Sequence, residues 1–171
     1  MRPQLRILAR VLRAVAAFFL FPVIGAFLSP APAAAQADGR AVAIVVHPQT
    51  AVDNLSFAQL RSIFLGEQQF WADRSRITLL VRAPVAAERE FVLNRIYRMN
   101  EAQFRQYWIA KMFRAEVASG PKIVISSDMT RELVSAIPGA IGFMPAADVG
   151  RDVKVLRIDG KLPGDSGYLL R

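Results

Sequence analysis

The chain has 171 residues, with 22 Lys plus Arg, 14 Asp plus Glu, one His and no Cys. The lack of cysteine excludes a disulfide scaffold, a Cys-based zinc site and a thiol nucleophile. Four arginines lie in the first 37 residues, which hold no acid, so the other 134 residues carry 18 cations against 14 acids. This net charge of +4 argues against a nucleic-acid-binding protein, and the remaining length suits one domain.

The N-terminal segment is typical of a signal peptide. A basic stretch at residues 1–13 precedes an apolar run of 15 residues at 14–28, and a Pro- and Ala-rich stretch then ends at Ala37. Ala35 and Ala37 are small residues at the positions that signal peptidase reads. The pattern therefore predicts export to the periplasm or secretion after cleavage near Ala37.

One alternative stays open, an uncleaved N-terminal membrane anchor, because no charge appears between Ala14 and Ala37. The apolar run is shorter than the roughly 20 residues that span a bilayer, and Pro22 and Gly25 interrupt it. We therefore expect a signal peptide over residues 1–37 and a single mature domain over residues 38–171.

The first half of the mature region alternates strand and helix patterns. Residues 41–46 form a continuous apolar run, which is typical of a strand buried on both faces. Ser56 is a good N-cap for a helix that Gly66 ends, with apolar residues at Phe57, Leu60, Ile63 and Phe64. A second buried strand is predicted over residues 77–81 and a second helix over residues 88–97.

The second half continues the alternation. Asn100 is expected to cap a third helix over residues 101–113, with Phe104, Tyr107, Trp108 and Met112 facing inward. Strands are predicted over residues 123–125, 140–144 and 153–158, with a helix before Pro138 and Gly139 and an irregular tail over about 160–171. The order predicts an α/β fold with a mostly parallel sheet and helices on both faces.

Ligands of open α/β sheets bind outside the carboxyl ends of the strands, where helix N-termini offer free N–H groups to anions. Three loops follow predicted strands, at residues 47–54, 82–88 and 126–128. Arg provides a bidentate fork for oxyanions, and hydroxyl groups provide neutral donors. The candidate ligands for a small oxyanion are therefore Thr50, Arg82, Ser126 and Ser127.

Simpler roles remain open for the same residues. Ser127 or Asp128 fits a plain helix N-cap, and Arg82 fits a solvated charge at the end of a strand.

The sequence offers little for catalysis. His47 is the only histidine and is followed by Pro48, which favours a loop residue over a member of a Ser-His-Asp triad. Glu88 and Glu90 are two residues apart and point to different sides of a helix, so they do not form an acid/base pair. No metal-ligand spacing and no Gly-rich phosphate loop is present. We therefore expect no enzyme, no metal and no cofactor, with a hydrolase built on His47 as a distant alternative.

Several segments together resemble the substrate-binding proteins of phosphate ABC transporters. The resemblance covers about residues 41–158 and implies one lobe of a periplasmic-binding-protein fold of the second type. It also implies an exported protein that binds phosphate or another oxyanion without chemistry, with an inner-membrane transporter or another envelope protein as partner. The segments that carry it are Val46-His47-Pro48, Leu55-Ser56, IFLG at 63–66, Trp71 with Asp73, Arg82, Tyr107-Trp108 and PGAIGF at 138–143.

The chain departs from that family at one element and in size, since such proteins usually clamp the ligand between two lobes and this chain is long enough for little more than one. There the strand-end Arg is followed by Ser-Gly-Thr, whose hydroxyls and amides hold phosphate, whereas the matching positions here are Ala86, Ala87 and Glu88. A carboxylate at this position repels a dianion, and each lost hydrogen bond to a charged ligand costs roughly 1.5–3 kcal/mol. The alternative function is therefore a protein-interaction module that kept the fold and lost ligand binding.

The cleavage site gives a first testable prediction. We expect the exported chain to begin at Asp38, because the residues that signal peptidase reads end at Ala37. Mass spectrometry of the protein from the periplasm or the medium measures this. A mature chain that still begins at Met1 would favour the membrane anchor.

Overall fold

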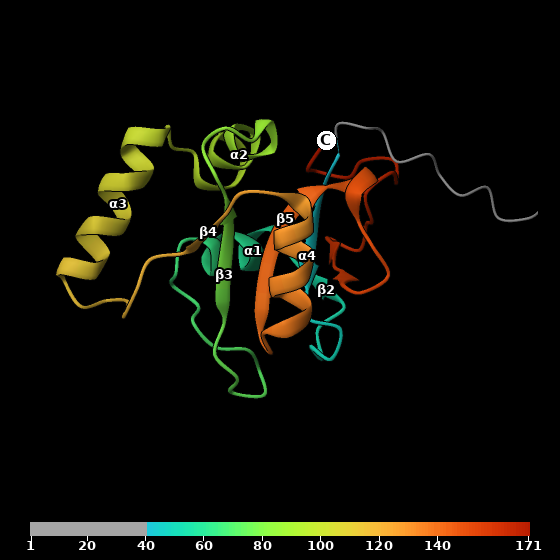
Figure 1. The fold of residues 1–171 in the computed structure, drawn as a ribbon, viewed down its shortest axis with the longest axis horizontal. Helices are drawn as coiled ribbons and strands as arrows, with labels where there is room; N and C mark the ends of the chain where they lie inside the picture. The colour runs from blue at the N-terminus through green and yellow to red at the C-terminus, as the bar shows by residue number, and fades with distance from the viewer. Residues whose placement is uncertain (1–40) are drawn as a thin grey trace, which may run out of the picture. The chain divides into compact units, whose positions relative to one another are not determined.

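A five-stranded sheet forms the centre of the computed structural model, which describes residues 41–171 (Figure 1). The strand order is β4-β3-β5-β1-β6. The expected signal peptide and its alternative, the membrane anchor, lie outside the described residues. The five strands are β1 (Val42–Val46), β3 (Thr78–Arg82), β4 (Lys122–Val124), β5 (Ala140–Pro145) and β6 (Lys154–Val155).

The strands do not all run in the same direction. β3 is parallel to both β4 and β5, whereas β1 is antiparallel to both β5 and β6. Only β1 therefore points the opposite way, and the sheet is mostly parallel, as expected. A separate two-stranded parallel sheet joins β2 (Asn54–Leu55) to β7 (Arg157–Ile158). The predicted strand at 153–158 is thus two short strands, since the buried Leu156 interrupts it and donates its N–H to Ile44.

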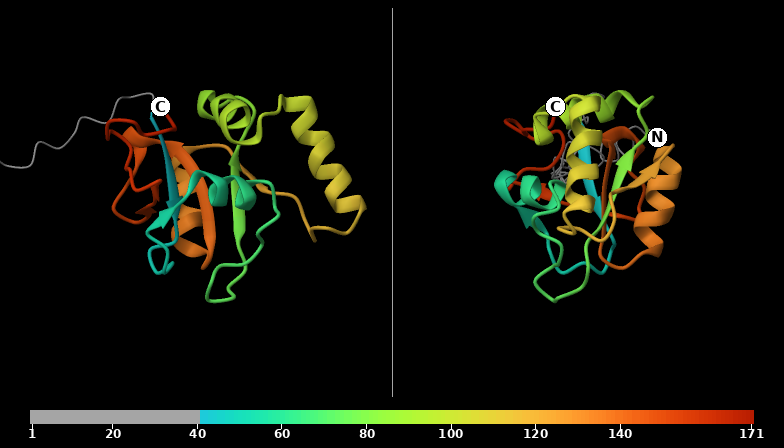
Figure 2. Two further views of the ribbon diagram at one scale, coloured as in Figure 1. Left: turned by 180° about the vertical axis from the view of Figure 1, so that it is seen from behind. Right: turned by 90° about the vertical axis from the view of Figure 1, so that its left-hand side faces the viewer.

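Helices cover both faces of the sheet, as predicted (Figure 2). Along β1 the side chains alternate, so that Val42, Ile44 and Val46 join one core cluster and Ala43 and Val45 join the other. The first cluster includes side chains from α1, α2 and α3, and the second includes those of α4. These helices are α1 (Phe57–Phe64), α2 (Ala87–Val92), a π-helical turn (Leu93–Tyr97), α3 (Glu101–Phe113) and α4 (Ser127–Ala136).

Local capping explains where two helices begin. Ser56 accepts a hydrogen bond from the backbone N–H of Gln59, whose side chain accepts from Ser56 N–H in return. Asn100 and Gln103 form the same capping box at the start of α3, which has the predicted bounds. The predicted helix over 88–97 is present but changes from α to π geometry at Leu93.

The two faces of α3 differ in burial. Phe104 and Trp108 are buried, as predicted, and the Trp108 ring packs so closely on Gly66 that a Cβ there would lie 2.8 Å from Cη2. Met112 was expected to face inward, but 42% of it is exposed, and the neighbouring Phe113 is 92% exposed. The last turn of α3 extends beyond the sheet, as Figure 1 shows at its left-hand side.

The tail after β7 has no helix or strand, as predicted, yet it is packed against the sheet. The Tyr168 hydroxyl donates to the carbonyl of Val42 at 2.8 Å, and Val42 N–H donates to the carbonyl of Leu170, which is fully buried. Within residues 41–171, no helix is long and apolar enough to cross a membrane.

Burial of Trp108 gives a stability prediction. Trp108→Ala should lower the free energy of unfolding by roughly 3–5 kcal/mol, because it removes a buried aromatic side chain. Ile109→Ala is the matched control, since Ile109 is 62% exposed on the same helix and should cost less than about 0.5 kcal/mol. Urea unfolding measures both, and equal losses would contradict the packing described for α3.

Candidate functional site

The ends of the adjacent strands β3 and β4 bring three candidate residues to one edge of the sheet. β3 and β4 are parallel, with Arg82 opposite Val124, and Ala83 N–H donates to the carbonyl of Val124 at 2.8 Å. Arg82 ends β3, while Ser126 and Ser127 follow β4 at the start of α4. In Figure 1 this edge lies at the top, beneath α2.

Arg82 is already paired within the chain. Its Nε donates to Glu88 Oε1 at 2.5 Å, and the two side chains are only 9% and 11% exposed. Glu88 lies in the first turn of α2, so the short loop after β3 returns a carboxylate to the guanidinium. This carboxylate occupies one donor of the guanidinium, Nε. The resemblance of the sequence to that family also indicates Glu88 as the residue that disfavours phosphate.

One nitrogen of the guanidinium has no acceptor. Arg82 Nη1 is buried and has no hydrogen-bond partner among the described residues. A buried donor of this kind carries a free-energy penalty unless a ligand or water satisfies it. Arg82 is therefore held by one carboxylate oxygen, and its buried Nη1 remains available as a donor.

A second buried arginine, which sequence reasoning missed, supports the site. Arg89 is 3% exposed, donates from Nη1 to the carbonyl of Arg82, and forms a bidentate pair with Glu101 in which both N···O distances are 2.9 Å. Its guanidinium also lies over the Phe104 ring, 4.9 Å from the centroid. The available signal was its position three residues before Val92, on the buried stripe of the helix.

The Arg89 pair has an electrostatic consequence. Hydrogen bonding from Arg89 lowers the pKa of Glu101 below its usual value of 4.5, with partial burial opposing that shift. Arg89 therefore links the end of β3, α2 and the start of α3 through a charged network. The network fixes the backbone carbonyl of Arg82 and hence the end of the strand.

The two serines are also engaged. Ser126 is the N-cap of α4, and its Oγ accepts from Met129 N–H at 3.0 Å. Ser127 lies inside the helix and donates its hydroxyl to Asp148 Oδ2 at 2.6 Å. The plain N-cap role that was weighed for Ser127 or Asp128 thus belongs to Ser126.

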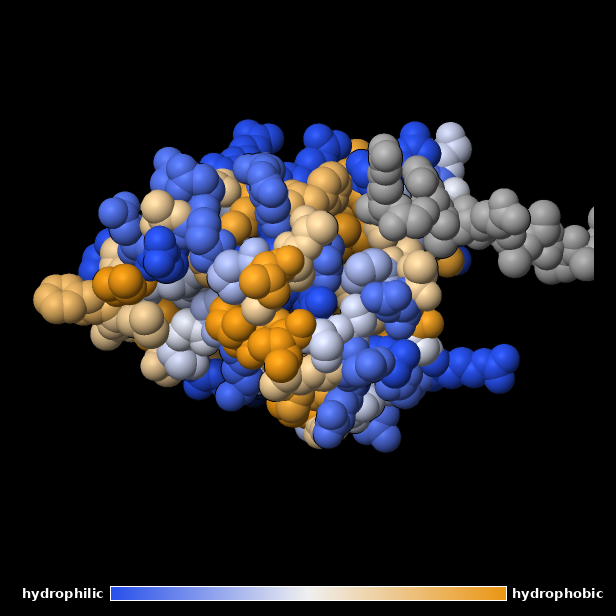
Figure 3. Space-filling model, turned by 45° about the horizontal axis from the view of Figure 1, so that its top comes forward, coloured by the Kyte–Doolittle hydropathy of each residue, from blue (hydrophilic) through white to orange (hydrophobic). Residues whose placement is uncertain are grey.

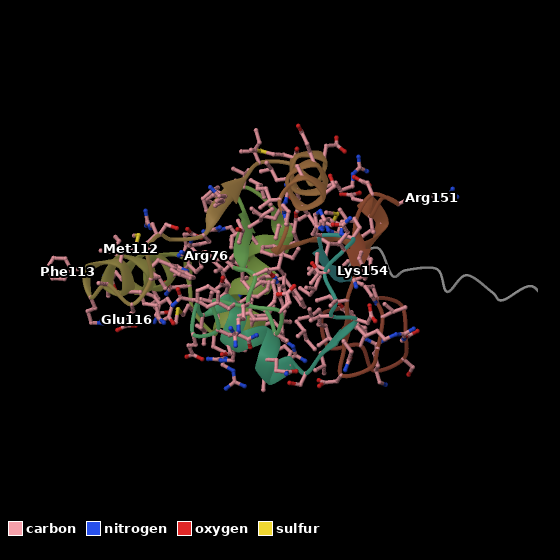
Figure 4. All side chains as sticks on the ribbon, turned by 90° about the horizontal axis from the view of Figure 1, so that it is seen from below. Arg76, Met112, Phe113, Glu116, Arg151 and Lys154 are labelled. Atoms are coloured by element: carbon pink, nitrogen blue, oxygen red, sulfur yellow. The ribbon has the colours of Figure 1, made fainter. Side chains whose placement is uncertain are left out.

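Thr50 does not join this group. Because β1 is antiparallel to β5, its end lies at the edge where β5 begins, and His47 N–H donates to the carbonyl of Ala140. Thr50 is buried there, and its hydroxyl has no hydrogen-bond partner among residues 41–171. Its carbonyl accepts from Lys154, which also pairs with Asp53 at 2.8 Å. Lys154 is labelled in Figure 4, which views the molecule from below relative to Figure 1. The structure therefore separates Thr50 from Arg82, Ser126 and Ser127.

Among the described residues, no three His, Asp or Glu side chains are placed to hold a metal ion. The groups at the carboxyl edge are a guanidinium, two hydroxyls and backbone N–H groups, which are donors for an anion. Two carboxylates of the chain, from Glu88 and Asp148, already accept from these donors.

Solved structures with this fold include phosphate-binding proteins. An ABC-type phosphate transport receptor from Vibrio cholerae has 23% sequence identity and a TM-score of 0.59, over 72% of this chain and 48% of its own. PstS from Borrelia burgdorferi has 18% identity and a TM-score of 0.60, over 76% of this chain and 53% of its own. A phosphate-binding protein from Stenotrophomonas maltophilia has 17% identity and a TM-score of 0.53, over 72% of this chain and 40% of its own.

No family model matches the chain, and no curated protein matches it. The chain spans about half the length of the first two of these structures. The likeness confirms the periplasmic-binding-protein-like fold that the sequence resemblance implied. These neighbours are phosphate-binding proteins, and two of them are the ABC-type phosphate transport receptor and PstS.

The Arg89–Glu101 pair predicts a pH dependence of stability. Because the pKa of Glu101 is lowered in the folded chain, its ionised form stabilises the fold above about pH 4.5, and this contribution is lost as the pH falls through the lowered pKa. Glu101→Gln should therefore cost about 1 kcal/mol at pH 7, since the carboxylate is partly screened by water, and less at pH 3. Urea unfolding at both pH values measures this, with the exposed Glu90→Gln as control. A cost that is equal at both pH values would contradict the role of the charge.

Proposed function

We propose that the chain is an exported, single-lobe solute-binding-like domain in which Glu88 closes the oxyanion site, so that it acts as a protein-interaction module of the cell envelope. The observation that carries the proposal is the 2.5 Å pair between Arg82 Nε and Glu88 Oε1, with both side chains about nine-tenths buried. Under this proposal the chain has the fold of the phosphate-binding proteins and is exported, but the edge of the sheet with Arg82 does not bind a free anion.

Physical competition supports a closed site. Glu88 is six residues from Arg82 on the same chain, so its carboxylate competes with free phosphate as an intramolecular ligand. Short tethers of this kind give effective concentrations of about millimolar or higher, which free phosphate must exceed. Phosphate that displaced Glu88 would also leave a second negative charge beside it. The hydroxyls that the family resemblance implies at positions 86 and 88 are absent, since Ala86 and Glu88 stand there.

Exposed apolar side chains support contact with another protein. The face shown in Figure 3 carries hydrophobic patches between hydrophilic residues. Isolated exposed apolar residues are common, but contiguous ones mark interaction surfaces. The partner proposed is an inner-membrane transporter or another envelope protein. The large apolar residues exposed in the described part of the chain are Phe70, Val85, Ile109, Met112, Phe113, Ile123 and Ile125.

The location and the absence of catalysis are proposed on separate grounds. Residues 1–37 have the pattern of a signal peptide, and one structural neighbour is named a high-affinity periplasmic phosphate-binding protein. The neighbours are binding proteins, and His47 Nδ1 accepts a hydrogen bond from the backbone N–H of Gln49 at 3.2 Å. A non-enzymatic role in the periplasm fits both.

A second candidate is direct binding of phosphate or another small oxyanion. It is favoured by Arg82 Nη1, which is buried and has no acceptor in the described part of the chain, and by the phosphate-binding neighbours. In this candidate the anion displaces Glu88 and takes Arg82 as its charged fork, with Ser126 and Ser127 as neutral donors. The two candidates therefore differ in the affinity of the native chain for phosphate.

Calorimetric titration of the mature chain with phosphate separates the two candidates. The native chain should give no binding heat at millimolar phosphate, because Glu88 already pairs with the guanidinium of Arg82. The triple variant Ala86→Ser, Ala87→Gly, Glu88→Thr should bind phosphate, because it removes the carboxylate and adds two hydroxyl donors. Adding Arg82→Ala to the triple variant should weaken that binding by about 30-fold or more, the usual effect of losing a buried charged partner.

Glu90→Thr is the matched control, since it removes an exposed carboxylate from the same helix, and it should not create phosphate binding. Micromolar binding by the native chain would contradict the closed site and establish the second candidate. Failure of the triple variant to bind would show that Glu88 is not what prevents binding.

A further inference from the structure

A separate cavity lies between α3 and the sheet, at the edge opposite Arg82. It has a volume of about 390 Å³ and lies between the end of α1, the beginning of β3 and the loop that joins α3 to β4. Cavities that hold small ligands begin at about 300 Å³. Arg76, which lines the cavity, lies between α3 and the sheet in Figure 4.

The charged residues that line this cavity are both cations. Arg76 and Lys122 are exposed, and neither forms an ion pair within residues 41–171. The nearest acid along the loop, Glu116, is not part of the lining and pairs with Arg114 at 2.5 Å and with Lys111 at 3.5 Å. Glu67 precedes the lining residue Gln68 but does not line the cavity. The cavity therefore attracts negative charge.

Part of the cavity wall is apolar, and the polar lining residues surround it. Ile63, Leu79, Trp108 and Val117 are buried residues that line it, and they provide a surface for an apolar body. The side chain of Gln69, another lining residue, donates to the carbonyl of Glu116 at 2.8 Å and so ties the segment before β3 to the loop after α3.

The backbone that carries Arg76 is also held. Arg76 pairs with Phe70 in an antiparallel bridge, and Ile77 N–H donates to the carbonyl of Gln69 at 2.9 Å. Gly139 fits against the carbonyl of Arg76 so closely that a Cβ at Gly139 would collide with it. The cation is therefore presented from a rigid segment, although its side chain is exposed.

We propose that this cavity binds a small organic anion that combines one phosphate, sulfonate or carboxylate group with an apolar body about the size of an aromatic ring. The anionic group lies between Arg76 and Lys122, and the apolar body packs on Trp108 and Val117. Neutral hydrogen-bonding groups come from Thr78 and Ser119, which also line the cavity. Bare phosphate leaves the apolar surface unused and binds more weakly.

This proposal is independent of the closed oxyanion site. Arg82 and Ser127 lie at the carboxyl ends of β3 and β4, whereas the cavity lies at the ends where these strands begin. A ligand can therefore occupy the cavity while Glu88 remains paired with Arg82.

Nuclear magnetic resonance of the ¹⁵N-labelled mature chain tests the proposal, with phenyl phosphate as the probe. Saturable shifts are expected at the amides of Thr78, Ser119 and Lys122, and none at Ala83 or Ser127. Inorganic phosphate and benzyl alcohol, titrated separately, should each bind at least about tenfold more weakly, because each lacks one half of the recognised chemistry.

Arg76→Gln and Lys122→Gln should each weaken phenyl phosphate binding by about tenfold, as expected for a lost charge-assisted hydrogen bond. Arg151→Gln is the matched control, because it removes the same charge from an exposed arginine on the other side of the molecule in Figure 4, and it should leave binding unchanged.

Three results would overturn the proposal: no saturable shift at millimolar phenyl phosphate, binding of benzyl alcohol as tight as that of phenyl phosphate, or an equal loss in Arg151→Gln. Shifts at Ala83 and Ser127 with inorganic phosphate would instead contradict the closed oxyanion site, so the two failures are distinguishable.

Discussion

The direction of β1 determines at which edge of the sheet the loop after it lies. β1 is buried on both faces and lies between β5 and β6, and it runs antiparallel to both of them. The loop after it therefore opens at the edge where β3 and β5 begin, which separates Thr50 from Arg82. One edge carries Arg82, Ser126 and Ser127, and the other carries a cavity lined by Arg76 and Lys122, which form no ion pair within residues 41–171.

At the first edge, buried charge is balanced inside the chain. Arg82 pairs with Glu88, and Arg89 pairs with Glu101 while donating to the carbonyl of Arg82. Moving an ion out of water costs several kcal/mol, so a buried guanidinium that loses its partner is strongly destabilising. The proposed closed site follows the same argument, because a free anion at Arg82 must replace Glu88 and leave that carboxylate close to another negative charge. The fold is like that of phosphate-binding proteins, and at this edge Glu88 balances the charge of Arg82, while Arg82 Nη1 has no acceptor among the described residues.

Sequence reasoning predicted the helices and strands better than the directions of the strands and the contacts between distant residues. The bounds of α3 followed from the Asn100 cap and the apolar spacing, and the strands followed from short β-branched runs, because these signals are local. The direction of β1 is not encoded in its own apolar pattern, so Thr50 was grouped with residues from the other edge. The pair of Ser127 with Asp148 joins positions 21 residues apart, and no local pattern indicates it. Met112 fits the apolar stripe of α3, but periodicity does not reveal that the end of this helix extends past the sheet.

The most direct test of the closed site is a crystal structure of the mature chain grown in a high concentration of phosphate. The account predicts that Glu88 remains within hydrogen-bond distance of Arg82 Nε and that no phosphate lies at the guanidinium. A phosphate ion bound to Arg82, with Glu88 turned away, would contradict it.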